Sequence, residues 1–195
     1  INLNLIEINK ELKNMQKKTL SKSQININKI HWNSNFDSIK QKPSIIIANE
    51  FFDCFAIKQF VKINHKWNER KIDLNKKENK LFIHNIVLNN IFLSKKLDKL
   101  LDQNKCNENQ TIEISIPREE YFNKVCNFIK KNSGVAIIID YGYVHPINYS
   151  TLQSVRFHRK TNILDNPGKQ DITSLINFQN LVKIAKKNNL NTYGP

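Results

Sequence analysis

Glycine is scarce in this chain: only four of its 195 residues are glycine, and no GxGxG pattern occurs anywhere. Such a pattern lets a loop approach the phosphates of a nucleotide closely, so the printed residues contain no phosphate-binding loop of this kind. Long apolar runs are also missing. The apolar runs are short, such as the one that contains Ala136–Ile139. They are far below the roughly 20 residues that cross a bilayer, and the sequence therefore predicts no membrane span.

Cysteine and histidine are few, and they are not spaced as metal ligands. The three cysteines, Cys54, Cys106 and Cys126, are odd in number, which favours free thiols in a reducing compartment over a disulfide framework. No zinc motif and no Ser-His-Asp pattern is present. We therefore expect no metal centre. Cys126 falls on an apolar helical face, where packing is the expected role.

Arginine is scarce too, since only four of the 31 basic residues are arginine. The net charge of +14 raises the hypothesis of a basic nucleic-acid-binding protein. Arginine, however, is the side chain best suited to bidentate recognition of phosphate and guanine. Lysine (27), asparagine (30) and isoleucine (28) instead supply 85 residues, as expected of an AT-rich genome. We favour this composition over nucleic-acid binding as the source of the charge.

Short strands alternate with amphipathic helices along the chain. Apolar spacing predicts strands over 3–8, 25–32, 44–50 and 134–142, the last two being β-branched runs typical of strands buried on both faces. Helices are predicted over 9–20, 95–110, 117–133 and 177–190, with Asn9 capping the first and Pro117 opening the third. Residues 66–88 predict a hairpin with its turn at Asn75–Asn79. This order predicts an α/β doubly wound sheet.

Polar residues stand where these strands end: Glu7, Asn49, Glu50, Asp53 and Asp140. Because open α/β sheets bind ligands at the carboxyl ends of their strands, these residues form the candidate site. An acid among Phe51, Phe52 and Phe55 loses part of its hydration, which suits it to bind a cation or a polar substrate. An arginine or lysine side chain would fit such a site.

The acids of the first and third strands also have structural interpretations. Glu7 suits two roles equally: an acceptor for both ribose hydroxyls, or a helix N-terminal acid favoured by the helix dipole. Asn49 and Asp53 could merely cap the following turn while Glu50 points to solvent. The residues alone leave both alternatives open.

Two later segments carry the same ambiguity. Asp140, Tyr141 and Gly142 suit a ligand site and a strand-end turn equally, because glycine permits a sharp departure from the sheet. The segment 156–173 is rich in His, Arg, Asp, Pro and Gly, and we expect an ordered functional loop there. His158 in that loop could act as a base, although a lone histidine without a defined partner is more often structural.

Five blocks resemble one known family. They are "IIIANEFFDCFAIKQF", "WNER", "IIIDYG", "STLQSVRFH" and "NPGKQDITSLINFQNL", and they occur in the order and spacing of the MidA-like S-adenosylmethionine-dependent methyltransferases. The resemblance runs from about Leu3 to Pro195. It implies the class I methyltransferase fold, a Rossmann-like sheet flanked by helices, as a single partial domain over 1–195 with an insertion at about 57–115.

The resemblance also implies which parts of that fold the printed residues contain. On this alignment the first strand and its glycine-rich loop precede Ile1, and the last strands follow Pro195, so we expect residues 1–195 alone to bind S-adenosylmethionine poorly. Glu7 would be the ribose-binding acid. Trp32 and Asn33 would lie near the adenine, and Asn49 would face the transferred methyl group.

The family's chemistry implies roles for the remaining candidates. Glu50 is the first choice and Asp53 the second for a clamp on an arginine guanidinium, and no metal is needed. The residues that would shape the acceptor pocket are Asp140, Tyr141, His158 and Asp171.

The family's mitochondrial members are protein-arginine methyltransferases that assist assembly of respiratory complex I, and its bacterial members are cytoplasmic. The implied partner is a protein substrate, such as a subunit of NADH dehydrogenase, in the cytoplasm of a bacterium or in the mitochondrial matrix. The alternative is a non-catalytic fragment or remnant that acts as a binding module.

Overall fold

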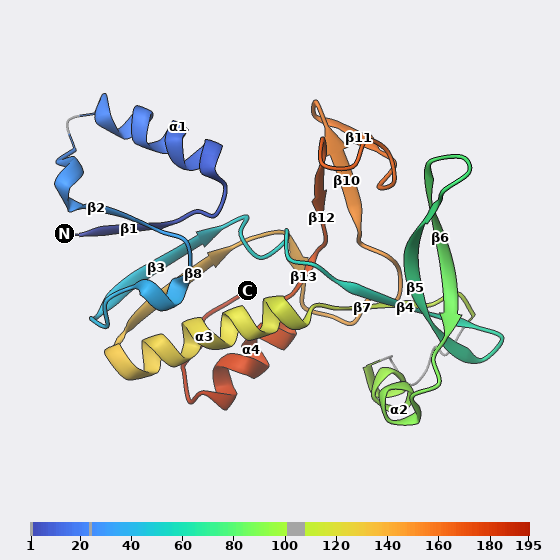
Figure 1. Cartoon of the computed structure of the whole chain (residues 1–195). Coiled ribbons are helices and arrows are strands. Elements are labelled where there is room, and N and C mark those ends of the chain that lie inside the picture. The colour runs from blue at the N-terminus through green and yellow to red at the C-terminus, as the bar shows by residue number, and fades with distance from the viewer. Residues whose placement is uncertain (1, 24, 101–107) are drawn as a thin grey trace.

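The computed structural model describes residues 2–23, 25–100 and 108–195 (Figure 1). At its centre are two pairs of parallel strands. In one pair β1 (Leu3–Ile6) lies beside β2 (Ile30–Asn33), and in the other β3 (Ser44–Asn49) lies beside β8 (Gly134–Ile139). β1, β3 and β8 run in the same direction in Figure 1, so their carboxyl ends lie on one side of the molecule. The predicted strands at 3–8, 44–50 and 134–142 are confirmed.

The strand predicted over 25–32 begins later than expected. Residues Ile27–Lys29 form a short 3-10 turn, and the strand starts only at Ile30. The reason is local, because the Asn26 side chain accepts a hydrogen bond from the backbone N–H of Asn28 and so caps that turn. The alternation of apolar and polar residues could not reveal this competition.

Helices α1 (Lys10–Ser21), α3 (Ile116–Asn132) and α4 (Phe178–Lys187) match predicted helices. Asn9 caps α1 as expected, accepting hydrogen bonds from the backbone N–H groups of Glu11 and Leu12. Pro117 lies in the first turn of α3, as expected, at the second helical position after the cap Ser115.

One face of the β3–β8 pair is covered by α3 and α4 (Figure 1). The core there contains Phe52, Phe122, Cys126, Ile176, Leu181 and Ala185, with Ala48 of β3 and Ile138 of β8 packed against it. Cys126 is buried as predicted and Cys54 is an exposed free thiol, whereas Cys106 lies outside the described residues.

The opposite face of this pair is exposed, so the prediction of strands buried on both faces is wrong for the described residues. Ile45 and Ile47 of β3 are 73% and 68% exposed, and Val135, Ile137 and Ile139 of β8 stand on the same face. The side chains are apolar as a buried strand requires, but no described element packs over them. Burial depends on what covers a strand, and the sequence of the strand does not contain that information.

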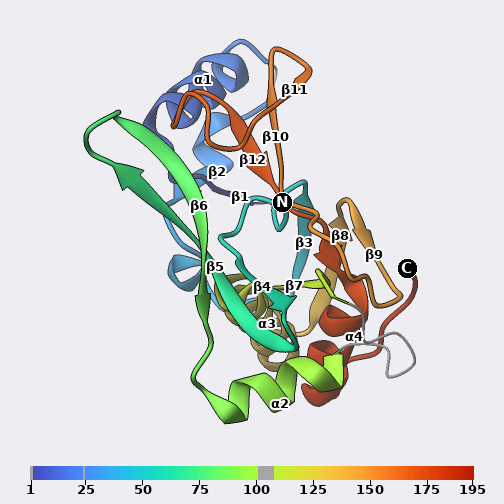
Figure 2. The same ribbon diagram turned by 90° about the vertical axis from the view of Figure 1, so that its right-hand side faces the viewer.

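Residues of the predicted insertion form a separate four-stranded antiparallel sheet. Its order is β6-β5-β4-β7, built from β4 (Lys58–Ile63), β5 (Lys66–Asn75), β6 (Lys80–Val87) and β7 (Thr111–Ile114). The predicted hairpin is confirmed as β5 and β6, which project together away from α3 and α4 (Figure 2). Helix α2 (Ile91–Leu100) packs beneath this sheet. It starts before the predicted 95–110, and residues 101–107 lie outside the described part.

The segment between β8 and α4 is built from short strands. β10 (Gln153–Arg156) lies between β11 (Arg159–Thr161) and β12 (Asp171–Thr173) in an antiparallel sheet. β9 (Gly142–Tyr143) pairs in parallel with β13 (Ile176–Asn177). A Cβ atom at the first residue of β9 would lie 2.4 Å from the carbonyl oxygen of Ile176, so close backbone approach requires glycine there.

Replacing Phe52 tests this packing. Its side chain is 1% exposed and its ring packs against Phe55 and Phe122. We expect Phe52→Ala to lower the free energy of unfolding by about 3–5 kcal/mol, through lost burial and the cavity left behind. Phe92, which is 82% exposed, is the control, and Phe92→Ala should change stability by less than about 0.5 kcal/mol. Urea denaturation monitored by circular dichroism measures both, and equal losses would contradict the assignment of this core.

Candidate functional site

The segment after β3 turns sharply at Glu50. Its backbone N–H donates to the carbonyl of Ile139 at 2.8 Å, which extends the pairing with β8 by one step. Its φ angle is then +45°, in the left-handed region that a residue with a Cβ rarely occupies and that costs about 1–2 kcal/mol. Strain of this kind often accompanies a functional position, and here it directs an exposed acid away from the strand.

Asp53 lies three residues further and is buried, with 8% of its surface exposed. No described residue donates a hydrogen bond to its carboxylate. Burial raises the pKa of Asp53, and the nearby carboxylates of Asp140, Asp171 and Glu50 raise it further, whereas Arg118 lowers it. These four acids define the acidic cluster: Glu50, Asp53, Asp140 and Asp171. The Asp53 oxygens are not among the fully enclosed, unpaired polar atoms of the described residues. A partly desolvated carboxylate that is still open to a ligand is suited to accept hydrogen bonds from a cation.

Asp140 joins the two loops that leave β3 and β8. Its Oδ2 accepts a hydrogen bond from the backbone N–H of Phe52 at 3.0 Å, and its Oδ1 accepts one from Tyr141 at 2.9 Å. The capping role considered for Asn49 and Asp53 is therefore performed by Asp140, because neither of those two side chains accepts a backbone hydrogen bond among the described residues. Asp140 contributes charge to the cluster while it fixes the loop of Asp53.

Asp171 and Tyr141 reach the cluster from different sides. Asp171 is the first residue of β12, and that strand leads to Ser174, whose backbone N–H donates to the carbonyl of Asp53 at 3.0 Å. Tyr141 accepts a hydrogen bond at its backbone carbonyl from Ile176, and its side chain is 62% exposed. Its ring is therefore accessible to a ligand that approaches this edge.

The residues expected to bind a cofactor lie at the ends of β1 and β2. Glu7 donates its backbone N–H to Asn33, and its Oε1 accepts a hydrogen bond from the backbone N–H of Asn9 at the start of α1. The indole N–H of Trp32 donates to Gln16 at 3.1 Å, and Lys17 lies over the Trp32 ring. Asn49, at the end of β3, is exposed. The helix-start role weighed for Glu7 is thus seen, and it occupies one carboxylate oxygen.

His158 is not brought to the acidic cluster. It lies in the turn between β10 and β11 with an exposed side chain, at the tip of a hairpin that projects from the core (Figure 1). Its φ angle of +58° follows from the tight turn. The sequence grouped His158 with the acids because the whole segment 156–173 is rich in polar residues, whereas the hairpin separates His158 from Asp171.

Two polar residues near the cluster escaped the sequence interpretation. Arg118 of α3 is buried and donates to backbone carbonyls on two loops. Glu113 of β7 accepts hydrogen bonds from the Gln59 side chain and from both the backbone N–H and the hydroxyl of Thr151. Arginine is so rare in this lysine-rich chain that each arginine is a candidate for a specific role, and that signal could have identified Arg118.

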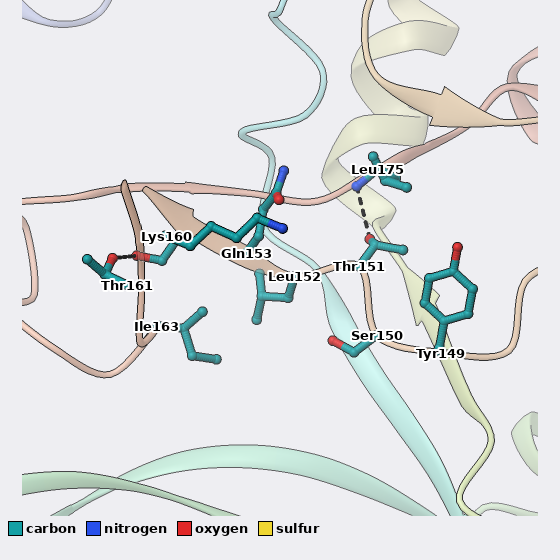
Figure 3. Close-up of a pocket in the computed structure, with 10 residues that line it drawn as sticks. Tyr149, Ser150, Thr151, Leu152, Gln153, Lys160, Thr161, Ile163 and Leu175 are labelled. Carbon is teal, nitrogen blue, oxygen red and sulfur yellow. Dashed lines mark hydrogen bonds between the residues drawn. The ribbon is translucent and has the colours of Figure 1, made fainter. Parts of the chain in front are cut away.

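A pocket of about 430 Å³ lies around β10 and β11 (Figure 3). Residues 149–154 line one part of it, and Lys160, Thr161, Ile163 and Leu175 complete the lining. The Thr151 hydroxyl accepts a hydrogen bond from the backbone N–H of Leu175 at 2.9 Å. The hydroxyl groups of Ser154 and Thr161 pair with each other, and those of Ser150 and Thr151 donate to Glu113. Because these groups already have partners, we assign the chemistry to the acidic cluster.

Comparison of the sequence and the structure with known proteins shows the family to which this chain belongs. The whole chain, residues 1–195, matches a family model described as "Putative S-adenosyl-L-methionine-dependent methyltransferase". Among curated proteins it is 27% identical over 170 residues to a mitochondrial protein arginine methyltransferase, the NDUFAF7 homologue of Caenorhabditis elegans, with 85% of this chain and 38% of that protein covered. It is 25% identical over 156 residues to NDUFAF7 of Danio rerio, with 80% and 36% covered. The chain therefore spans well under half the length of these relatives.

Solved structures show the same fold. A superfamily member from Burkholderia thailandensis with bound S-adenosyl-homocysteine is similar with a TM-score of 0.79 and 18% identity, over 96% of this chain and 48% of that one. A native structure of a protein of the same superfamily and organism matches equally well, over 50% of its length. The prediction of a Rossmann-like α/β methyltransferase fold is confirmed.

The raised pKa of Asp53 makes a prediction about stability. Since the unfolded value is about 3.9, the folded chain holds this proton more tightly, and stability falls as the pH rises from that value through the folded pKa. Asp53→Asn removes the effect. The variant should be more stable than the unaltered chain at pH 7 by about 1.4 kcal/mol per unit of pKa shift.

The two proteins should become equally stable below about pH 3.5, where Asp53 is protonated in both states. Urea unfolding between pH 3 and 8 measures the difference, with Asp165→Asn, at an exposed position, as the control. A variant that is less stable at pH 7 and no different from the control in its pH dependence would contradict the burial of an unpaired charge.

Proposed function

Since the chain belongs to this family of S-adenosyl-L-methionine-dependent methyltransferases, we propose that it forms the acceptor-binding part of a protein-arginine methyltransferase. The observation that carries the proposal is Asp53, a residue that is 8% exposed and whose carboxylate accepts no hydrogen bond from the described residues. Glu50 and Asp140, at the carboxyl ends of two parallel strands, and Asp171, at the start of β12, are the acids near it. A cluster of this charge attracts a guanidinium, which has five donors and stays protonated. The names of the relatives support arginine as the acceptor.

The strand ends fit part of the cofactor. Glu7 and Trp32 stand at the ends of adjacent strands, with a carboxylate suited to ribose hydroxyls and an aromatic ring suited to adenine. S-adenosylmethionine would supply the electrophilic methyl group. No glycine-rich loop is present among the printed residues, and each parallel pair is only two strands wide, with edges that no described strand pairs. We propose that cofactor binding requires polypeptide beyond residues 1–195 at these edges.

The acids would act on the acceptor. A protonated guanidinium is a poor nucleophile, so two of its nitrogens must be bound while the third is aligned with the methyl group. Glu50, which is exposed, and Asp53, which is largely buried, would accept hydrogen bonds from those nitrogens and stabilise the positive charge during transfer. As the new N–C bond forms and the methyl–sulfur bond of the donor breaks, the attacking nitrogen would lose a proton to one of these carboxylates, so that the product keeps a single positive charge. Asp140 would hold the loop in place, with Tyr141 and Asp171 at the sides of the acceptor. His158 lies too far along its hairpin to join them, and we assign it no role.

The acceptor would be an arginine on a protein. The names of the relatives give arginine methylation and a mitochondrial location. From the family resemblance we propose a subunit of NADH dehydrogenase as the substrate, in a mitochondrial matrix or in the cytoplasm of a bacterium. None of the described helices is long and apolar enough to cross a membrane.

A second candidate is a non-catalytic binding module. The exposed apolar face of β3 and β8 favours it, because such a face is typical of an interaction surface. Cofactor binding separates the two candidates, since a module would retain the fold and bind no cofactor.

Calorimetry with S-adenosylmethionine is the first test. We expect little or no heat of binding to residues 1–195 alone, because the paired strands leave the methionine end of the cofactor without backbone donors. The same residues expressed with the adjoining coding sequence should bind with an affinity measurable by calorimetry. If that longer protein also fails to bind, the methyltransferase proposal is wrong and the binding module remains.

Glu50→Gln tests the clamp in the protein that binds the cofactor. Removing one charged acceptor should lower kcat on the order of 100-fold while cofactor affinity stays within about threefold, because Glu50 acts on the acceptor. Transfer of a radioactive methyl group to protein arginine measures the rate. Glu78→Gln, in the exposed turn of the hairpin, is the matched control, and an unchanged rate for Glu50→Gln would remove Glu50 from the clamp.

A further inference from the structure

Arg118 lies in the first turn of α3 and is almost completely buried. Only 7% of the Arg118 surface is exposed, whereas most of the other basic residues lie at the surface. The turn that carries it is fixed by Ser115, whose hydroxyl accepts a hydrogen bond from the Arg118 backbone N–H and donates one to the carbonyl of Ala56. The side chain therefore leaves the helix from a defined position beside the loop that follows β3.

Its guanidinium joins two loops that are distant in the sequence. On the first loop, Nε donates to the carbonyl of Phe52 at 2.7 Å and Nη2 to that of Asp53 at 3.5 Å. On the second, Nη1 donates to the carbonyl of Leu175 at 3.2 Å, and Nη2 donates to the hydroxyl of Ser174 at 2.7 Å and to its carbonyl at 3.5 Å. All three nitrogens are used.

Both loops are close in the chain to members of the acidic cluster. The first contains Asp53 itself, and the second directly follows β12, which begins at Asp171. Among the described residues no carboxylate forms an ion pair with Arg118, so carbonyl dipoles bind a cation that stays charged. Burial lowers the pKa of Arg118, and the nearby Asp140, Tyr143, Glu113 and Asp53 oppose that change. The positive charge lies behind the acids and offsets part of their mutual repulsion.

We propose that Arg118 is a positioning residue, which holds the loops of Asp53 and Asp171 together so that the acidic cluster can bind the acceptor guanidinium. This inference rests on the proposed function. Arg118 does not touch the acceptor, because its donors are directed to backbone carbonyls. Lysine cannot replace it, because an ammonium group is compact and cannot reach both loops with a planar set of donors. The requirement explains an arginine at this buried position in a chain whose basic residues are mostly lysine.

Two variants separate geometry from charge in the protein that binds the cofactor. Arg118→Lys keeps the positive charge but loses the planar set of donors that reaches both loops. We therefore expect kcat to fall about 100-fold because the acids are misplaced, while the dependence of the rate on pH changes little. Arg118→Gln also loses the positive charge, so the carboxylates of the cluster should be protonated at higher pH. The fall of the rate on the acidic side of its pH profile should therefore move to higher pH. The other charged or titratable groups that face Asp53 are Glu50, Cys54, Asp140 and Asp171, and none of them is altered.

Arg159→Gln and Arg159→Lys, at an exposed position in β11, are the controls and should behave like the unaltered protein. Active-site titration with the bound cofactor corrects each rate for folded protein. A merely structural arginine would reduce the folded fraction and leave the corrected kcat and the pH profile unchanged. That result, or a Lys variant with full kcat, would overturn the proposal.

A measurement that does not depend on enzyme activity distinguishes the role of Arg118 from the proposed methyltransferase function. Carbon NMR of the Asp53 carboxyl group in the chain itself should show its pKa shifted upward in Arg118→Gln and nearly unmoved in Arg118→Lys and in the Arg159 controls. If the unaltered protein transfers no methyl group but this shift is found, the proposed function fails while the electrostatic role of Arg118 stands. An unmoved Asp53 in a folded Gln variant would overturn that role.

Discussion

The parallel pairing of β3 with β8 is the constraint on which the site depends. It aligns Asn49 with Ile139 at the end of the ladder, so that two chain segments some 90 residues apart leave the sheet at the same level. Only then can Asp140 accept a hydrogen bond from the backbone of Phe52. A shift of one residue in this register would turn every side chain to the opposite face and separate the acids.

The acidic cluster is held against its own electrostatics. Asp53 is desolvated and faces three like charges, which would favour either protonation or an opening of the loop. The structure opposes opening through contacts that do not touch the carboxylate: the aromatic packing of Phe52, the hydrogen bonds of Asp140, and the guanidinium of Arg118 behind the loop. The acceptor oxygens of Asp53 consequently stay available, and a bound cation would relieve the repulsion.

Much of the fold was predictable, because local signals and the final structure agree. The cap at Asn9, the turn of the hairpin after Asn75 and the β-branched runs of β3 and β8 each act over a few residues. The candidate acids at the strand ends followed from parallel topology. The features that the sequence could not predict depend on distant contacts. Arg118 donates hydrogen bonds to residues 56 to 66 positions away. His158 is separated from Asp171 by the hairpin of β10 and β11. The exposure of Ile45 and Ile47 depends on which elements are present to cover them.

The close approaches at glycine bear on how this chain has changed over time. A Cβ at Gly134 would lie 2.2 Å from the carbonyl oxygen of Ser44, and one at Gly142 would meet both Ile176 and the ring of Phe178. Codons for glycine are rich in G and C, and the composition of the chain reflects strong pressure toward A and T. Glycine has survived that pressure where a side chain would separate neighbouring strands. Two of the four glycines thus mark places where the fold admits no side chain, whereas a Cβ at Gly168 or Gly194 would meet no atom within 4 Å, and only their positive φ angles favour glycine there.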